Sequence, residues 1–327
     1  MRKIAILTLT ILALVAAFAT EGKIIKSQPR STKAWNVSNG NVGRSTNNAV
    51  NNRSASSITS SEMDLNTSPS PDVGVGEAAD GQMLIINIGD AAFIMIKVDG
   101  GTFTMGATSE QGSTNPIEQP AHEVELTTFY IGEAEVTQQT WIAVMGFNPS
   151  ININDMRNPV NNITWDDSQR FVNRLNTLFA GAYAKEMRFS LPTEAQWEYA
   201  ARGGPQSKGY RFAGSNYENS VAWNKANSDG TIHPVKEKFP NELGLYDMSG
   251  NVWEWCQDLW NPNYYSNSPR LNPVCTSTTP NFSTFHIARG NGIKSIPGCY
   301  LAWRNAYPNT SKGVDIGMRL VVTISDN

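Results

Sequence analysis

The sequence predicts an α+β fold that is irregular and rich in loops, with few short helices and strands. Three observations lead to this class. Only 17% of the 327 residues are charged, while nine are Trp and 26 are Gly, which suits a domain held together by aromatic packing. Strand-like runs precede helix-like runs along the chain. After residue 204 the helical periodicity ends, and Gly, Pro and Asn separate short apolar pieces.

The first 19 residues have the three parts of a secretory signal peptide. Met1-Arg2-Lys3 is basic, residues 4–18 are almost wholly apolar, and Ala17-Phe18-Ala19 is a small-x-small cleavage signal. A transmembrane anchor is the alternative, but this apolar run is shorter than the roughly 20 residues that a spanning helix needs. We therefore expect an extracytoplasmic protein (periplasmic, cell-surface or secreted) that keeps no membrane anchor after cleavage.

Residues 20–82 are rich in Ser, Asn and Thr and poor in large apolar side chains. Such a stretch cannot bury enough apolar surface to offset the entropy lost on ordering. We expect a flexible linker, with short strands possible near Met83–Ile88. A single domain is expected over residues 83–327.

Alternating apolar runs and turn residues predict the strands of this domain. The expected strands are Phe93–Val98, Thr102–Gly106, His122–Leu126, Phe129–Ile131 and, at the end of the chain, Met318–Ile324.

Three helices are expected, each preceded by a capping threonine. Thr137 precedes Gln138–Met145, Thr164 precedes Trp165–Phe179, and Thr193 forms a capping box with Gln196 over Glu194–Arg202. In the third helix Trp197 and Ala200-Ala201 should face inward. Glu198 and Arg202 are four residues apart and could form an ion pair.

Charge and metal-ligand spacing exclude several classes of function. The net charge is -3, which offers no electrostatic basis for binding nucleic acid. An odd count of cysteines, at positions 256, 275 and 299, leaves at least one thiol unpaired, and no CxxC spacing supports a zinc site. The three histidines are scattered and show no ligand spacing; they are His122, His233 and His286.

Several motifs occur in an order that resembles one family. They are VDGGTFTMG at 98–106, LPTEAQWEYAARGG at 191–204, NELGLYDMSGNVWEW at 241–255, Arg289-Gly290 and Gly317-Met318-Arg319-Leu320. This series resembles the formylglycine-generating enzyme, or sulfatase-modifying-factor, superfamily over roughly residues 93–322. The resemblance implies a loop-rich fold related to C-type lectins.

The resembling oxidases bind copper(I) through two cysteines that lie five residues apart. Anchored on Arg289 and Arg304, the matching positions here are Ser295 and Tyr300, with Cys299 beside the second. A single thiolate cannot supply the pair of soft ligands that such a site needs. Copper is therefore not expected, and Cys299 is expected only as a degenerate remnant. An iron-dependent branch of the superfamily places its histidines largely on an extra helical domain, and nothing here matches it.

The resemblance also implies a structural calcium ion. Its ligands would be the side chains of Asp247 and Glu254 and the carbonyls of Gly250 and Val252. Two carboxylates around a glycine-containing turn supply the oxygen ligands that calcium prefers. A metal-free turn, in which both carboxylates accept backbone N–H bonds, is the alternative.

The segment between Arg289 and Arg304 keeps its flanking residues and departs from the family pattern between them. That departure indicates either a variable surface that displays ligand-binding side chains or plain drift. The candidate display residues are Asn291, Ile293, Lys294, Ile296, Tyr300, Leu301 and Trp303. Leu301 and Trp303 could instead belong to the core.

The main functional hypothesis is an exported, calcium-stabilised, non-catalytic binding protein whose C-terminal surface recognises a protein or a glycan. The alternative is an oxidoreductase of the same superfamily with a degenerate active site.

Overall fold

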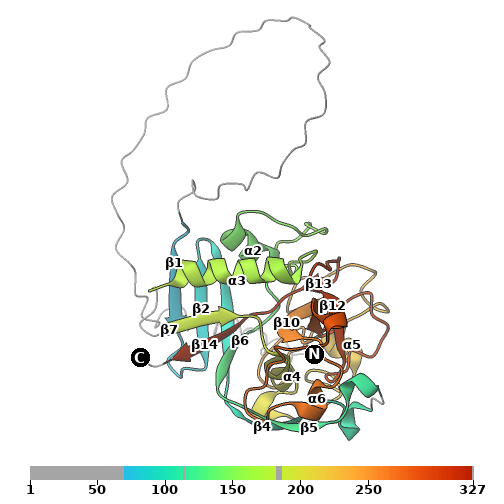
Figure 1. Cartoon of the computed structure of the whole chain (residues 1–327). Coiled ribbons are helices and arrows are strands. Elements are labelled where there is room, and N and C mark those ends of the chain that lie inside the picture. The colour runs from blue at the N-terminus through green and yellow to red at the C-terminus, as the bar shows by residue number, and fades with distance from the viewer. Residues whose placement is uncertain (1–69, 113–114, 182–185, 326–327) are drawn as a thin grey trace, which may run out of the picture. The chain divides into compact units, whose positions relative to one another are not determined.

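The computed structural model describes residues 70–112, 115–181 and 186–325 (Figure 1). The expected signal peptide and most of the expected linker lie outside these residues. One correction concerns the end of the expected linker. Strand β1 (Val73–Glu77) falls inside the segment expected to be a linker, because it pairs with β2 (Met83–Ile88) and packs Val73 and Val75 against the core.

A six-stranded sheet forms one half of the described domain, in the order β1-β2-β3-β6-β14-β7. Its other strands are β3 (Ala91–Val98), β6 (Phe129–Gly132), β7 (Glu186–Ser190) and β14 (Val321–Ser325). All neighbouring pairs are antiparallel. The expected strands near 83–88, 93–98, 129–131 and 318–324 therefore join a single sheet, whereas β1 and β7 were missed.

Two helices pack on this sheet (Figure 1). They are α2 (Gln138–Met145) and α3 (Trp165–Phe179), with the expected bounds. Thr164 and Asp167 form a capping box at the start of α3. The rings of Trp141 and Phe171 stack with their centroids 4.9 Å apart, which joins the two helices through the main core.

The second half combines short strands with loops. Its strands are β4 (Gly101–Met105), β5 (His122–Leu126), β8 (Ala222–Trp223), β9 (Ser249–Gly250), β10 (Trp253–Leu259), β11 (Phe285–Arg289), β12 (Arg304–Pro308) and β13 (Ile316–Gly317). They form two pairs, β4-β5 and β8-β9, and a four-stranded sheet in the order β12-β11-β10-β13.

Three α-helices lie in this half, namely α4 (Glu194–Ala201), α5 (Glu218–Val221) and α6 (Tyr264–Asn267). Helix α4 has the expected capping box and buries Trp197, Ala200 and Ala201 completely. Short 3-10 turns occupy Ser109–Gln111, Pro116–Glu118, Gly204–Gln206 and Pro280–Phe282. Among the residues described, no helix combines the length and the apolar character needed to cross a bilayer.

Candidate functional site

Helix α4 is the centre of a buried network of ion pairs. Arg304 donates from Nε to Glu194 Oε1 at 2.7 Å and from Nη2 to Glu194 Oε2 at 2.5 Å. Arg289 donates from Nη2 to Glu198 Oε2 at 2.5 Å. Arg202 donates from Nε to Glu198 Oε1 at 2.9 Å, which confirms the expected pair within the helix.

This network fixes both ends of the segment in which the family's chemistry was expected. Arg289 ends β11 and Arg304 begins β12, and both guanidinium groups are almost completely buried against α4. Charges buried this deeply are tolerated when they are paired, and each guanidinium pairs with a carboxylate of α4, although Arg289 Nε itself has no acceptor among the described residues. The retained arginines therefore hold residues 290–303 in place.

The two cysteine positions of the resembling oxidases carry hydroxyl groups here. The half-buried Ser295 accepts the Gly292 N–H through Oγ at 3.3 Å, and the Tyr300 ring stacks on Phe212 with centroids 5.3 Å apart. Hydroxyl oxygens are harder ligands than thiolates and do not suit copper(I). Neither position can take over the role of the missing thiolate.

Cys299, the cysteine nearest to these positions, is buried and shielded. Its side chain packs in a small apolar cluster with Phe212 and Val221. The Glu218 carboxylate accepts the Cys299 N–H at 3.0 Å and the Gly298 N–H at 2.8 Å. Burial, and then repulsion from Glu218, raises the pKa of the Cys299 thiol well above its ordinary value. The thiol therefore stays protonated near neutral pH. Thiolate, and not the protonated thiol, is the form that binds metals and reacts.

The other two cysteines lie on and beside strand β10. Cys256 and Cys275 are also free and buried. Burial raises the pKa of Cys256 well above its ordinary value and that of Cys275 to about 11. Neither thiol resembles an activated nucleophile.

The expected calcium ligands lie in a buried acidic region around Arg319. Glu254 is already bonded: Oε1 accepts from Arg319 Nη2 at 2.7 Å, and Oε2 accepts from Trp197 Nε1 at 2.6 Å. Asp247 accepts the Lys236 N–H through Oδ2 at 2.8 Å. Sequence reasoning assigned Glu254 to the metal and missed its buried arginine partner.

Glu135 is a third carboxylate in this region, which sequence reasoning also missed. Its Oε1 accepts the Val252 N–H at 3.0 Å, next to the turn that contains Gly250. Burial, together with repulsion from Asp247 and Glu254, raises the pKa of Glu135 well above its ordinary value. Burial likewise raises the pKa of Asp247 to about 6.

Three buried carboxyl groups face a single guanidinium in this region. Their raised pKa values show that burial and mutual repulsion disfavour the ionised forms of Glu135 and Asp247. Within the described ranges, no group of three or more Asp, Glu, His or Cys side chains could hold a metal ion by itself. A calcium ion here would use Asp247 and the carbonyls of Gly250 and Val252, and would share Glu254 with Arg319.

A cavity of about 470 Å³ lies beside the segment between Arg289 and Arg304, and we call it the C-terminal pocket. It is lined by Trp253, Asn291, Lys294, Ser295, Ile296, Trp303, Asn305, Tyr307, Lys312, Gly313, Asp315 and Ile316. The segment expected to display ligand-binding side chains thus contributes five of the lining residues. The others come from β10, β12, β13 and the loop between β12 and β13.

Only part of the expected display set is placed to meet a ligand. Lys294 and Ile296 are exposed, and Trp303 is half-buried at the pocket wall. Ile293 is a correction, because its side chain is 1% exposed in a hydrophobic cluster, and Leu301, at 2%, belongs to the core, which was the alternative left open for it. Asn291 lines the pocket but is only 1% exposed, so it is not displayed as expected, and Tyr300 stacks on the Phe212 ring and does not line the pocket.

The C-terminal pocket also contains residues that sequence reasoning missed. Asn305 and Tyr307 alternate along β12 and therefore face the same side. That alternation could have indicated from the sequence that Asn305 and Tyr307 lie on one face of a strand. Lys312 and Asp315 lie in a loop without periodicity, and nothing local indicates that they approach Lys294.

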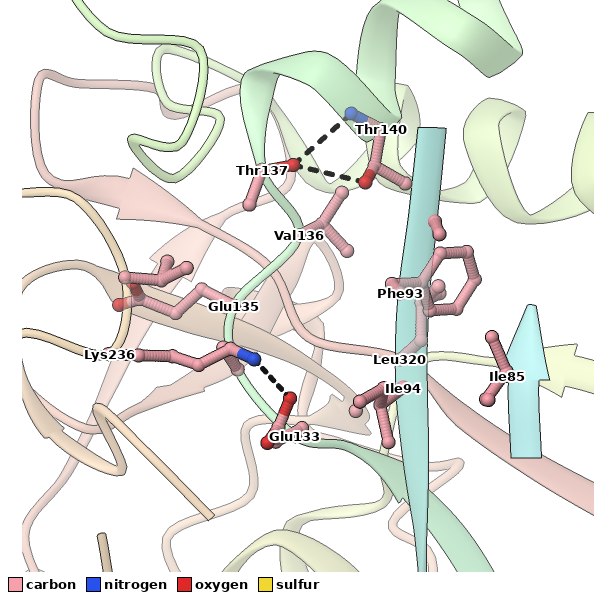
Figure 2. Close-up of a pocket in the computed structure, with 14 residues that line it drawn as sticks. Ile85, Phe93, Ile94, Glu133, Glu135, Val136, Thr137, Thr140, Lys236 and Leu320 are labelled. Carbon is pink, nitrogen blue, oxygen red and sulfur yellow. Dashed lines mark hydrogen bonds and ion pairs between the residues drawn. The ribbon is translucent and has the colours of Figure 1, made fainter. Parts of the chain in front are cut away.

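A second cavity, of about 280 Å³, lies between the six-stranded sheet and the start of α2. Figure 2 shows the aromatic ring of Phe93 and the side chains of Ile85 and Ile94 on one side of it. On the other side Lys236 forms an ion pair with Glu133. No sequence signal predicted this cavity.

The three histidines do not form a cluster, and each packs against a different aromatic ring. His122 packs on Tyr265, His233 on Trp223 and His286 on Trp165, with centroid distances of 4.6, 3.7 and 3.8 Å.

Curated relatives include both enzymes and proteins named for other roles. The chain is 28% identical to the chaperone protein LppX of Paenibacillus barcinonensis, over 69% of this chain and 88% of the relative. It is 29% identical to the formylglycine-generating enzyme of Streptomyces coelicolor, over 54% of this chain and 73% of the relative.

Solved structures show the same fold. The Treponema denticola variable protein 1 matches with a TM-score of 0.59 and 27% identity, over 72% of this chain and 97% of that chain. PvdO from Pseudomonas aeruginosa matches with a TM-score of 0.61 and 23% identity, over 73% and 97%. The family model of the sulfatase-modifying factor enzyme 1-like domain matches residues 91–324. The 191–204 motif contains α4, and β10 begins within the 241–255 motif. Because the family model covers most of the chain, the chain belongs to this formylglycine-generating-enzyme-like family.

Proposed function

We propose that this chain is an exported, non-catalytic binding protein that recognises its ligand in the C-terminal pocket. One observation carries the proposal. Ser295 and Tyr300 stand where the family's oxidases have their cysteine pair, and the neighbouring Cys299 thiol is buried with a raised pKa. The segment keeps its buried arginine anchors and has lost the ligands for copper.

The pocket supports binding by its size and its lining. A cavity of about 470 Å³ is in the range that holds small ligands or the anchoring group of a larger one. Trp303 offers a large contact area at low entropic cost. Two relatives carry names that agree with a binding role, since one is called a chaperone and another a variable protein.

The competing function is an oxidoreductase with a degenerate active site. It is favoured only by the likeness to formylglycine-generating enzymes. The test is anaerobic titration of the purified protein with copper(I), with the Streptomyces coelicolor enzyme as positive control. We expect no stoichiometric tight binding and no oxidation of a cysteine-containing peptide. Either activity, if lost in Cys299→Ala, would refute the proposal.

We also propose that a calcium ion stabilises the turn at Gly250. The support is the cluster of three buried carboxyl groups around Arg319, because a bound cation would stabilise the ionised forms that burial disfavours. Calcium added after chelation should raise the melting temperature of the wild type. Asp247→Asn should weaken this response, whereas Asp229→Asn should keep it.

These two aspartates are a matched pair. Asp247 and Asp229 have similar backbone angles, with φ of 57 and 52, which asparagine also tolerates. They differ in burial, since Asp247 is 2% exposed and Asp229 is an exposed loop residue. An equal response to calcium in both variants, or none in the wild type, would rule out the ion.

The proposed export rests on the pattern of residues 1–19. N-terminal sequencing of the mature protein from the native host should begin at Thr20. A chain that keeps Met1 in the cytoplasmic fraction would contradict export. Ala19→Arg, which destroys the small-x-small signal, should leave the precursor uncleaved.

A further inference from the structure

The C-terminal pocket has a chemical character that narrows the class of its ligand. The aromatic rings of Trp303 and Tyr307 line the pocket together with polar side chains such as Asn305. Asn305 Nδ2 donates to the Tyr307 hydroxyl at 2.9 Å, which orients both groups at the pocket wall. Flat rings flanked by hydrogen-bonding groups suit a ligand with one apolar face and several hydroxyls.

The base of the pocket contains an acceptor that lacks a donor. Asn291 is 1% exposed, and its Oδ1 accepts no hydrogen bond from any described residue. Its Nδ2 donates to the Gly298 carbonyl at 3.4 Å, which fixes the orientation of the amide. This Oδ1 atom has almost no exposed surface, so a ligand hydroxyl can donate to it only when the Asn291 side chain shifts toward the cavity; the unpaired acceptor favours that contact.

The pocket also carries a positive excess. Lys294 and Lys312 are exposed, and neither ammonium pairs with a carboxylate within the part of the chain that the structure describes. The nearby Asp315 is 7% exposed and accepts the Lys294 backbone N–H at 3.2 Å. The Lys294 ammonium also interacts electrostatically with Asp315, so two ammonium groups face one carboxylate in this pocket, and the remaining positive charge favours an anionic ligand.

We infer that the C-terminal pocket binds a short acidic oligosaccharide, whose sugar ring stacks on Trp303 and whose carboxylate pairs with Lys294 or Lys312. This inference rests on the binding function proposed above. An acidic peptide would also pair with the lysines, and its backbone N–H groups could donate to Asn291, but its backbone has no sugar face to stack on Trp303. A neutral glycan would satisfy Asn291 and leave both ammonium groups unpaired.

The test is isothermal titration of the full-length mature protein with three uronate oligomers, built from galacturonate, mannuronate or glucuronate. Each is paired with its methyl ester, which keeps the sugar chain and removes the charge. A peptide of alternating Asp and Gly is the competing ligand. We expect at least one uronate to bind, and its methyl ester to bind about tenfold more weakly or worse, as loss of a charged hydrogen bond implies.

Variants locate the site. Trp303→Ala and Lys294→Ala should each weaken uronate binding by about tenfold. Lys208→Ala, an exposed lysine outside the pocket, should leave it unchanged. Because Trp303 also packs against the main core, its variant is first checked by circular dichroism.

Three outcomes would overturn the inference. They are equal binding of uronate and ester, preference for the peptide, and no binding of any uronate. Preference for the peptide would leave the non-catalytic binding function standing. Only copper(I) binding or peptide oxidation would remove that function as well, so the two failures are distinguishable.

Discussion

Glu218 binds the main chain of Cys299: Oε1 of the carboxylate accepts the Cys299 N–H at 3.0 Å. The same carboxylate accepts the Asn224 side-chain amide at 2.9 Å, so α5 and the loop after β8 are tied to residues 298–299. The contact holds Cys299 by its backbone, with its thiol in an apolar cluster. A reactive cysteine needs the opposite surroundings, positive and open to solvent.

Native Cys299 should therefore be inert toward thiol reagents. The pKa values of all three thiols are raised, chiefly by burial, so little thiolate forms at pH 8. Ellman's reagent should label the native protein slowly and label three thiols after denaturation in guanidinium. Rapid labelling of one native thiol that disappears in Cys299→Ala would contradict this environment.

The α4 network should carry a large share of the stability of the second half. Glu194→Gln leaves the buried Arg304 without its charged partner, and loss of one member of a buried ion pair costs about 3–5 kcal/mol. Urea denaturation measures the change. Glu123→Gln removes the same charge from an exposed pair with Arg270 and should leave the free energy of unfolding nearly unchanged. Equal effects of the two variants would show that burial does not matter here.

Gly250 should resist substitution for a reason beyond its backbone angle. Gly250 and Gly244 both have positive φ, at 86 and 82. A Cβ on Gly250 would lie 2.2 Å from the Trp223 carbonyl oxygen, whereas one on Gly244 would meet nothing within 4 Å. Gly244→Ala should cost about 1–2 kcal/mol for the left-handed conformation alone. Gly250→Ala should cost clearly more and reduce the soluble yield; equal melting temperatures would refute the clash.

Asp258 should make the fold less stable as pH rises toward neutrality. Burial, and then repulsion from Glu194, raises its pKa to about 7 in the folded state, above the 3.8 of a free aspartate. Between these two values the folded protein holds a proton that the unfolded chain has lost. Stability from this group is therefore fully present below the unfolded value of 3.8 and declines as pH rises from there to about 7, above which both states have lost the proton.

The Asp258→Asn variant isolates that contribution. Urea denaturation from pH 5 to 7 should show a slope that is less negative in the variant, by up to about 1.4 kcal/mol per pH unit. His286, whose pKa burial lowers, contributes the opposite slope in both proteins and cancels in the comparison. Parallel curves would mean that Asp258 titrates normally.

The elements that sequence reasoning predicted well are those with local signals. Helices α2 and α3 begin and end at the expected residues, because a capping threonine and helical periodicity are both read within one segment. Strand β1 was missed, because its glycines and valines resemble linker and only pairing with β2 orders it. Strand β7 reads EMRFS and does alternate polar and apolar residues, but it is only five residues long and was not predicted; it pairs with β14 in the sheet.

The candidate site was predictable only in part. Residues Lys294, Ile296 and Trp303 could be located between two anchors that the motifs identify. Ile293 and Leu301 lie between the same anchors and yet point into the core. In an irregular loop no period tells which side chains face solvent, so the pattern could not separate these groups.

By itself, the sequence determined the family, the three capped helices and the absence of the cysteine pair at Ser295 and Tyr300. Each of these depends on residues close together in the chain. The tertiary structure alone decided that Glu254 pairs with Arg319, that Cys299 is shielded by Glu218, and that Lys312 and Asp315 join Lys294 around one pocket. These contacts join residues 18 to 81 positions apart, and only the packing of α5, β10, β12 and the loops beside them brings such residues together.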